Sequence, residues 1–161
     1  MKHQSISKKV FFLLMAVIIP LAVGGIASFF TISEIGSWYS TLEKPWFNPP
    51  NWIFGPVWTT LYLLMGYSSW RIWNTSAGKT RSKALIVYGL QLFLNFWWSI
   101  FFFHFQQIGL ALIEISLLWI SLFVMIVLFY KLDKPAGLLQ IPYIIWVSFA
   151  SLLNAAIYTL N

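Results

Sequence analysis

The stretch that decides the fold is Trp38–Gly66, which reads WYSTLEKPWFNPPNWIFGPVWTTLYLLMG. It holds four of the ten tryptophans and four of the seven prolines of the chain. Residues that precede proline are driven toward extended conformations, so the first half of the stretch resists becoming helix. Pro56 is favourable at the start of a helix, because the first turn needs no N–H there. The stretch therefore predicts a stiff, aromatic loop that leads directly into an apolar helix.

The composition around this stretch is that of a membrane protein. Of 161 residues, 60% are hydrophobic and only 9% are charged, whereas a soluble domain carries about 25% charged residues. Such a chain would expose large apolar patches to water. Its length suits a single domain over residues 1–161. The absence of cysteine excludes disulfides and thiolate metal sites.

Five apolar stretches are long enough to cross a bilayer, since a helix needs about 20 apolar residues to do so. They cover about residues 10–32, 53–73, 84–103, 108–130 and 138–160. Backbone polar groups cannot stay unpaired in lipid, so these stretches are helices rather than strands. We expect an all-α membrane protein, a bundle of five transmembrane helices. The longest connection, residues 33–52, is long enough to suggest a functional loop.

Positive charge is concentrated on one side of this predicted bundle. Nine of the ten basic residues fall on that side: Lys2, Lys8, Lys9, Arg71, Lys79, Arg81, Lys83, Lys131 and Lys134. The positive-inside rule then places the N-terminus in the cytoplasm and the C-terminus outside, as five crossings require. The net charge of +6 is thus an orientation signal and does not indicate nucleic-acid binding. The first apolar run is longer than the 7–15-residue core of a signal peptide, so we expect it to be retained.

Three of the predicted helices carry an aromatic ring and a polar or small neighbour on one face, at spacings of three, four or seven residues. These faces are Trp58 and Tyr62, then Gln91, Asn95 and Trp98, then Tyr143, Trp146, Ala150 and Asn154. One interpretation is interhelical hydrogen bonding, worth about 1 kcal/mol per pair, which we favour for Asn154. The other is a cavity, which we favour for Asn95. An interfacial aromatic belt explains Trp38, Trp70 and Trp73.

Other polar or small residues within the predicted spans suit structural roles better than chemical ones. Glu114 could couple to protons, but without a basic partner a hydrogen bond to a neighbouring helix end is favoured. His104 lies in a short turn, which disfavours iron ligation, and we find no metal site or catalytic triad. Small residues recur four apart on the first helix, which predicts close packing, most simply within the subunit. They are Ala16, Pro20, Gly24 and Ser28.

The loop over residues 33–52 suits a lid over the outer ends of the helices. A simple cap that joins the first two helices is the alternative, but a cap does not need Trp46 and Trp52.

Three motifs resemble the TspO/MBR family, which comprises the tryptophan-rich sensory proteins of bacteria and the mitochondrial translocator protein, also called the peripheral benzodiazepine receptor. The motifs are residues 38–67, QLFLNFWWSIFFF at 91–103 and PYIIWVSFASLLN at 142–154. The resemblance implies a five-helix bundle, often a homodimer, in a cell membrane, here the plasma membrane. It also implies a pocket on the loop side that binds protoporphyrin IX or haem, with no cofactor required, and benzodiazepine-type ligands. Carried over by motif, the pocket residues are Tyr39, Trp46, Trp58, Tyr62, Asn95, Trp98, Trp146 and Ala150.

Two departures from the family pattern are visible. No Lys or Arg follows Tyr158, so sterol recognition through that motif is disfavoured. Gly89 is followed four residues later by Phe93, so the small-residue dimer face of the third helix is missing.

Three functional hypotheses follow from the resemblance. The first is a tetrapyrrole-binding protein that promotes light-dependent oxidation of protoporphyrin IX, with Trp58 and Trp146 as electron donors beside the pigment. The second is a transporter of tetrapyrroles, and the third is a porphyrin sensor without catalysis.

Overall fold

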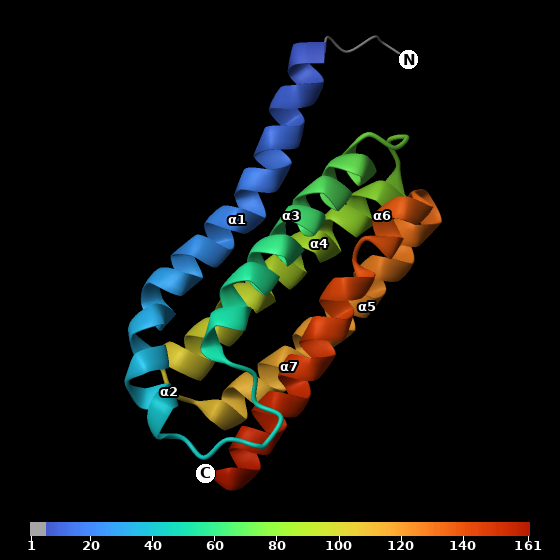
Figure 1. Cartoon of the computed structure of the whole chain (residues 1–161). Coiled ribbons are helices and arrows are strands. Elements are labelled where there is room, and N and C mark those ends of the chain that lie inside the picture. The colour runs from blue at the N-terminus through green and yellow to red at the C-terminus, as the bar shows by residue number, and fades with distance from the viewer. Residues whose placement is uncertain (1–5) are drawn as a thin grey trace.

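The computed structural model describes residues 6–161, and helices fill most of that range (Figure 1). In chain order the elements are α1 (Ile6–Gly36), α2 (Trp38–Thr41), the 3-10 turn η1 (Asn51–Ile53), α3 (Phe54–Trp73), α4 (Lys79–Ser99), the π-helical turn η2 (Ile100–His104), α5 (Ile108–Leu132), α6 (Lys134–Leu138) and α7 (Ile141–Leu160). No strand occurs within residues 6–161. The predicted all-α class is therefore confirmed. Lys2, which was counted in the charge pattern, lies outside the described residues.

Five long helices correspond to the five predicted stretches, with corrected ends. The first helix extends about one turn further at each end, and α4 begins at Lys79 rather than at residue 84. The predicted fifth helix corresponds to α7, which begins at Ile141 rather than at residue 138. The short helix α6, which was not predicted, precedes it and ends at Leu138, and both helices carry a proline in their first turn. The π-helical turn was not predicted, and Gln106, with φ of 57°, ends the helical run that precedes α5.

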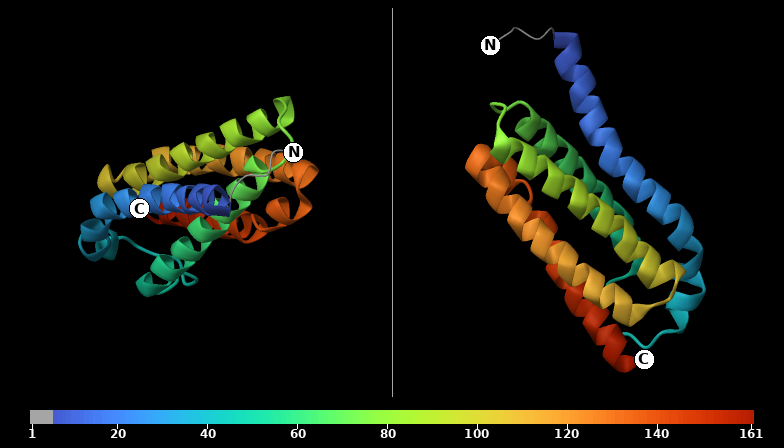
Figure 2. Two further views of the ribbon diagram at one scale, coloured as in Figure 1. Left: turned by 90° about the horizontal axis from the view of Figure 1, so that it is seen from above. Right: turned by 180° about the vertical axis from the view of Figure 1, so that it is seen from behind.

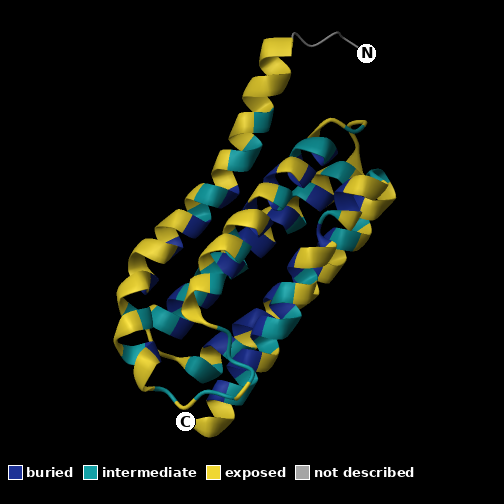
Figure 3. Cartoon of the chain, in the orientation of Figure 1, coloured by how far each residue is buried: buried dark blue, intermediate teal, exposed yellow. Residues whose placement is uncertain are grey.

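By length and apolar composition, four helical segments within the described residues could cross a membrane. They are Ile6–Gly36, Lys79–His104, Ile108–Leu132 and Lys134–Leu160. The 20-residue helix α3 is not among them, because Thr59, Thr60, Ser68, Ser69 and Arg71 make it more polar. Large apolar side chains are exposed along the outside of the bundle, as for Phe29 (80%) and Ile113 (63%) (Figure 3). An apolar exterior of this kind suits lipid rather than water.

The helix α1 packs against α3 through small residues. A Cβ at Gly66 of α3 would lie 2.5 Å from Val17 Cα and 2.7 Å from the Ala16 carbonyl oxygen. A Cβ at Gly24 of α1 would lie 2.1 Å from the Tyr62 ring. Small residues let helix backbones approach closely, so the predicted packing face of the first helix is confirmed and lies within the subunit. The N-terminal part of α1 extends away from the other helices (Figures 1 and 2).

An ion pair closes the end of the bundle where α3 meets the α5–α6 junction. Arg71 donates through Nε and Nη2 to the two carboxylate oxygens of Asp133, at 3.0 and 2.9 Å. Asp133 Oδ1 also accepts from the Ala136 backbone N–H at 2.8 Å and so caps α6. Hydrogen bonding by Arg71 lowers the pKa of Asp133 below its ordinary value. The cap and the ion pair together hold the break between α5 and α6 in place.

Candidate functional site

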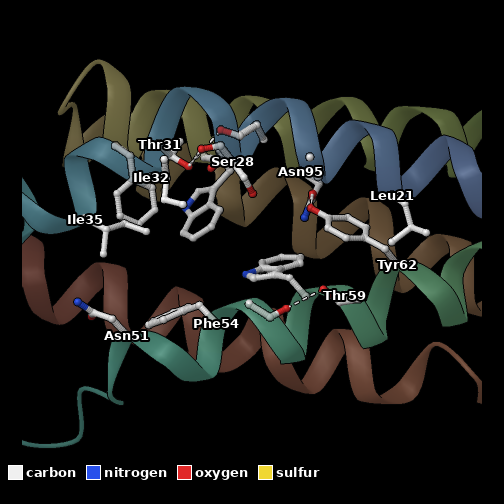
Figure 4. Close-up of a pocket in the computed structure, with 18 of the residues that line it drawn as sticks. Leu21, Ser28, Thr31, Ile32, Ile35, Asn51, Phe54, Thr59, Tyr62 and Asn95 are labelled. Carbon is white, nitrogen blue, oxygen red and sulfur yellow. Dashed lines mark hydrogen bonds between the residues drawn. The ribbon is translucent and has the colours of Figure 1, made fainter.

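A cavity of about 600 Å³ lies between α1, α3 and the end of α4 (Figure 4). Helix α1 contributes Leu21, Gly24, Gly25, Ala27, Ser28, Thr31, Ile32 and Ile35; α2 contributes Tyr39; η1 and α3 contribute Asn51, Trp52, Phe54, Gly55, Trp58, Thr59 and Tyr62; α4 and η2 contribute Asn95, Trp98, Ser99 and Phe103. Gly25, Ile32, Trp52 and Gly55 are exposed, so the mouth of the cavity lies between α1 and the start of α3.

One wall of the cavity is built from three neighbouring rings. Trp58 stacks on Tyr62, one helical turn along α3, with ring centroids 5.6 Å apart and an interplanar angle of 27°. Trp58 also lies 6.3 Å from the ring of Trp98 on α4. Aromatic pairs in such offset arrangements contribute about 0.5–1.5 kcal/mol beyond the area they bury. The rings therefore form a pre-assembled aromatic surface.

A row of buried hydrogen bonds fixes this wall from behind. Tyr62 Oη donates to Asn95 Oδ1 at 2.8 Å, and Asn95 Nδ2 donates to Tyr143 Oη at 3.1 Å. Tyr143 Oη in turn donates to Gln91 Oε1 at 2.9 Å. Asn95 thus joins α3 to α7 and also lines the cavity. Asn95 therefore lines the cavity, as we expected, and it also makes the interhelical hydrogen bonds of the alternative interpretation. Its role in ligand binding stays a prediction.

Trp98 is held by the residue that we expected to join helices. Its Nε1–H donates to Asn154 Oδ1 at 3.2 Å, and Asn154 Nδ2 donates to the Ile108 carbonyl oxygen at 3.0 Å. Asn154 is 1% exposed, so the predicted interhelical role is confirmed.

The opposite wall comes from α1, a helix in which we expected no pocket residue. Gly24 and Ser28 lie on this wall, one turn apart, and Thr31 follows them. The Thr31 hydroxyl donates to the Ala27 carbonyl oxygen of its own helix at 3.1 Å, so its hydrogen is already used within α1. The sequence feature that could have predicted this wall is the four-residue spacing of small residues on the first helix, which we interpreted only as helix packing.

The structure brings five of the eight predicted pocket residues to this cavity: Tyr39, Trp58, Tyr62, Asn95 and Trp98. Trp46, Trp146 and Ala150 do not line it. Trp46 is 95% exposed. The Trp146 ring instead contacts Phe149 and the cavity residue Phe54, at centroid distances of 5.4 and 5.9 Å. Ala150, one turn further along α7, is buried in the helix packing.

The loop between α2 and η1 is fastened to the end of α7 rather than stretched over the cavity. The Glu43 backbone N–H donates to Asn161 Oδ1 at 3.0 Å, and Asn161 Nδ2 donates back to the Glu43 carbonyl oxygen at 3.1 Å. Phe47 packs against Phe149. Only the ends of the predicted 33–52 lid reach the cavity, through Ile35, Tyr39, Asn51 and Trp52. In the middle of the loop Phe47 lies against α7, and Trp46 is turned outward.

The cavity lining contains no Asp, Glu, Lys, Arg or His. Within the described residues, no group of three His, Cys, Asp or Glu side chains could hold a metal ion. The lining is therefore suited to binding a flat, apolar molecule by contact and stacking, with a few neutral polar groups to orient it.

Two further polar residues, Glu114 and His104, lie outside the cavity. Glu114 is 6% exposed, and neither carboxyl oxygen has a hydrogen-bond partner within the described residues. The expected hydrogen bond to a neighbouring helix end is therefore wrong. His104 is exposed and its ring lies against Phe30 and Phe105.

Comparison with known proteins identifies the family of this chain. A sequence profile of the TspO/MBR family matches residues 16–160. The chain belongs to the TspO/MBR family. It is 46% identical over 154 residues to the tryptophan-rich protein TspO of Archaeoglobus fulgidus, covering 92% of this chain and 96% of that one. It is 40% identical to the TspO of Chlorobaculum tepidum over 156 residues, with 96% and 99% covered. It is 37% identical over 139 residues to the human translocator protein, with 84% and 82% covered. The chain is a membrane protein of this family.

Proposed function

We propose that this protein binds tetrapyrroles within the membrane, with protoporphyrin IX lying flat against Trp58 in the cavity between α1, α3 and α4. The observation that carries the proposal is the stacked pair of Trp58 and Tyr62, 5.6 Å apart, in an uncharged cavity of about 600 Å³. A porphyrin is a flat aromatic plate, and indole and phenol rings offer it large apolar faces. The cavity volume lies inside the range of about 300–1,000 Å³ typical of ligand pockets. Membership of the TspO/MBR family supports the same ligand class.

The cavity favours a metal-free porphyrin over haem. Axial ligation of haem iron uses His, Cys, Met or Tyr, and the lining has no His, Cys or Met. Its two tyrosines are engaged elsewhere, since Tyr39 Oη donates to Asn48 Oδ1 at 2.7 Å and Tyr62 Oη donates to Asn95 Oδ1. Benzodiazepine-type compounds, which are also flat and aromatic, are proposed to enter the same cavity.

We further propose that α3 is a fifth membrane crossing, with the N-terminus in the cytoplasm and the C-terminus outside the plasma membrane. The helices α1 and α4 both begin next to basic residues, at Lys8, Lys9 and Lys79. For both to start on the same side, the chain must return across the bilayer in α3. At about 1.5 Å per residue, its 20 residues span about 30 Å. Contacts with α1 at Gly66 and with α4 at Tyr62 support this position. A homodimer is proposed from the family alone.

A bound porphyrin would be illuminated beside Trp58. We propose that the Trp58 indole passes an electron to the light-excited pigment and that the reduced pigment passes it on to dioxygen. The reactive oxygen species formed in this way is then the oxidant that attacks the pigment. Trp146 was assigned the same role from the sequence. Its indole lies against Phe54 and Phe149 and does not line the cavity. Trp58 is therefore the electron donor to test first. The pigment carries the photochemistry and the protein positions it.

The decisive experiment is a titration of the purified protein with protoporphyrin IX in the dark, followed by tryptophan fluorescence, and then illumination. We expect saturable quenching that weakens strongly in Trp58→Ala and little in Trp119→Ala. Trp119 is a suitable control because it lies on α5 outside the cavity and bonds Ser148. Equal loss of binding in both variants would contradict the proposed site. Saturable binding without light-dependent loss of the pigment would exclude photo-oxidation and leave transport or sensing.

A further inference from the structure

The cavity leaves the acidic groups of a tetrapyrrole without a counter-charge inside it. None of its lining side chains is charged, and burying an ionised carboxylate without a partner is very costly. Tetrapyrroles of the protoporphyrin class carry carboxylates at one edge of the ring. That edge must therefore lie at an end of the cavity, where a cation or water can meet it.

Lys44 is the one basic residue between Lys9 and Arg71 in the sequence. Its ammonium lies 4.9 Å from the centroid of the Tyr39 ring, and Tyr39 lines the cavity and is 3% exposed. Tyr39 is in turn held by its hydrogen bond to Asn48. Lys44 is thus fixed next to the cavity wall, at the end that carries the α2 segment.

The Lys44 ammonium retains capacity for an anion. It donates to the Leu42 carbonyl oxygen at 3.0 Å and to the Ser40 carbonyl oxygen at 3.4 Å. A lysine has three N–H donors, so at least one is left. Within the described residues the ion pair is that of Arg71 and Asp133, and no carboxylate pairs with Lys44.

The other charged groups at this end are the acidic residues Glu34 and Glu43. Glu34 accepts from Ser33, Ser37 and Gln106. Glu43 is joined to Asn161 through its backbone. Both carboxylates repel an anionic ligand, so Lys44 provides the attractive position for a carboxylate near the cavity.

We propose that Lys44, which lies beside Tyr39 at the α2 end of the cavity, binds a carboxylate of the tetrapyrrole there and thereby selects acidic porphyrins over neutral ones. The inference rests on the proposed function, because it concerns the same cavity. Lys44 acts as a specificity residue, while the aromatic wall supplies the contact that all porphyrins share.

The test compares two ligands and three proteins. Dissociation constants are measured in the dark for protoporphyrin IX and for its dimethyl ester, which keeps the ring and removes both charges. The proteins are the parent chain, Lys44→Met and the control Lys83→Met, whose lysine is exposed at the opposite end of α4. We expect Lys44→Met to weaken the diacid by about fivefold, as for a partly exposed ion pair, and to leave the ester unchanged. Lys83→Met should change neither, and Lys44→Arg should restore binding of the diacid.

The outcomes separate the inference from the proposed function. Equal weakening of diacid and ester in Lys44→Met would show that Lys44 only supports the loop, and it would overturn the inference. Unchanged binding of both ligands would overturn it too. If the parent chain bound neither porphyrin, the proposed function itself would fail and the inference with it. Added salt should weaken the diacid more than the ester, because it screens the exposed pair.

Discussion

Gly24→Ala should block the cavity by one methyl group. Gly24 lies on α1, lines the cavity and faces Tyr62 on α3. The new Cβ would lie 2.1 Å from Tyr62 Cε2 and 2.6 Å from Cζ. Ordinary contact between carbon atoms is about 3.5–4.0 Å, so the ring must move by more than 1 Å or α1 must move away from α3.

The expected loss of stability and of ligand affinity follows from the interactions that Tyr62 makes. Moving its ring breaks the 2.8 Å hydrogen bond to Asn95 and the stacking on Trp58. Overpacking of a well-packed core costs about 1–3 kcal/mol, and a buried acceptor left without a donor costs about 1–3 kcal/mol. We expect a combined loss of about 2–6 kcal/mol, shared between folding and binding, and porphyrin affinity reduced by at least about tenfold.

An exposed glycine outside the cavity supplies the matched control. Gly89 lies on α4, does not line the cavity, and a Cβ added there meets no atom within 4 Å. Because alanine is the better helix former by about 1 kcal/mol, Gly89→Ala should bind protoporphyrin as the parent chain does and unfold at the same or a slightly higher temperature. Tryptophan quenching in the dark and thermal unfolding in one detergent measure both quantities. If Gly24→Ala matched Gly89→Ala in affinity and stability, the α1–α3 cavity wall would be wrong.

Three further predictions follow from the same geometry. Gly66→Ala should destabilise the protein by about 2 kcal/mol or more, because its Cβ would meet the Val17 backbone at 2.5 Å; unchanged thermal unfolding would contradict the close α1–α3 packing. Trp58→Phe should slow the loss of the porphyrin absorption band under light while binding stays measurable, whereas Trp146→Phe should not; equal rates in both variants would exclude an electron-donating role for Trp58. Because Arg71 lowers the pKa of Asp133 below its ordinary value of 3.8, the ion pair stabilises the fold above that pH, and its contribution is lost as the pH falls through the lowered pKa. Asp133→Asn should remove about 1 kcal/mol of stability at neutral pH and flatten this acid dependence; a variant as acid-sensitive as the parent chain would refute the assignment.

The helices and the polar wall of the cavity could be predicted because both depend on local spacing. Apolar runs of about 20 residues identify helices in lipid, and positions four apart share a helix face. This logic placed Trp58 with Tyr62 and Asn95 with Trp98. The same logic could not separate these faces from the Trp146–Ala150 face of α7. Which face turns toward a cavity depends on how each helix is rotated against its neighbours, and residue spacing does not contain that information.

The loop and the α1 wall depended on contacts distant in sequence. Trp46 is turned outward because Glu43 is fastened to Asn161, 118 positions away. We interpreted Gly24 as a packing residue, and it does pack against Tyr62. The same residue also lines the cavity, which its spacing in the sequence does not reveal. The π-helical turn Ile100–His104 follows directly after Ser99 and sets the position of Phe103. No residue in that turn signals it from the sequence, since its apolar run suits a regular helix equally well.

The proposed ligand cavity lies between α1, α3 and α4. An experimental structure of the protein with protoporphyrin IX bound in the dark would show the position of the ligand. We expect the porphyrin ring against Trp58 and Tyr62, with Gly24 on the other side and a carboxylate toward Lys44. A ring found instead against Trp146 and Phe149, on the other side of Phe54, would contradict this proposal.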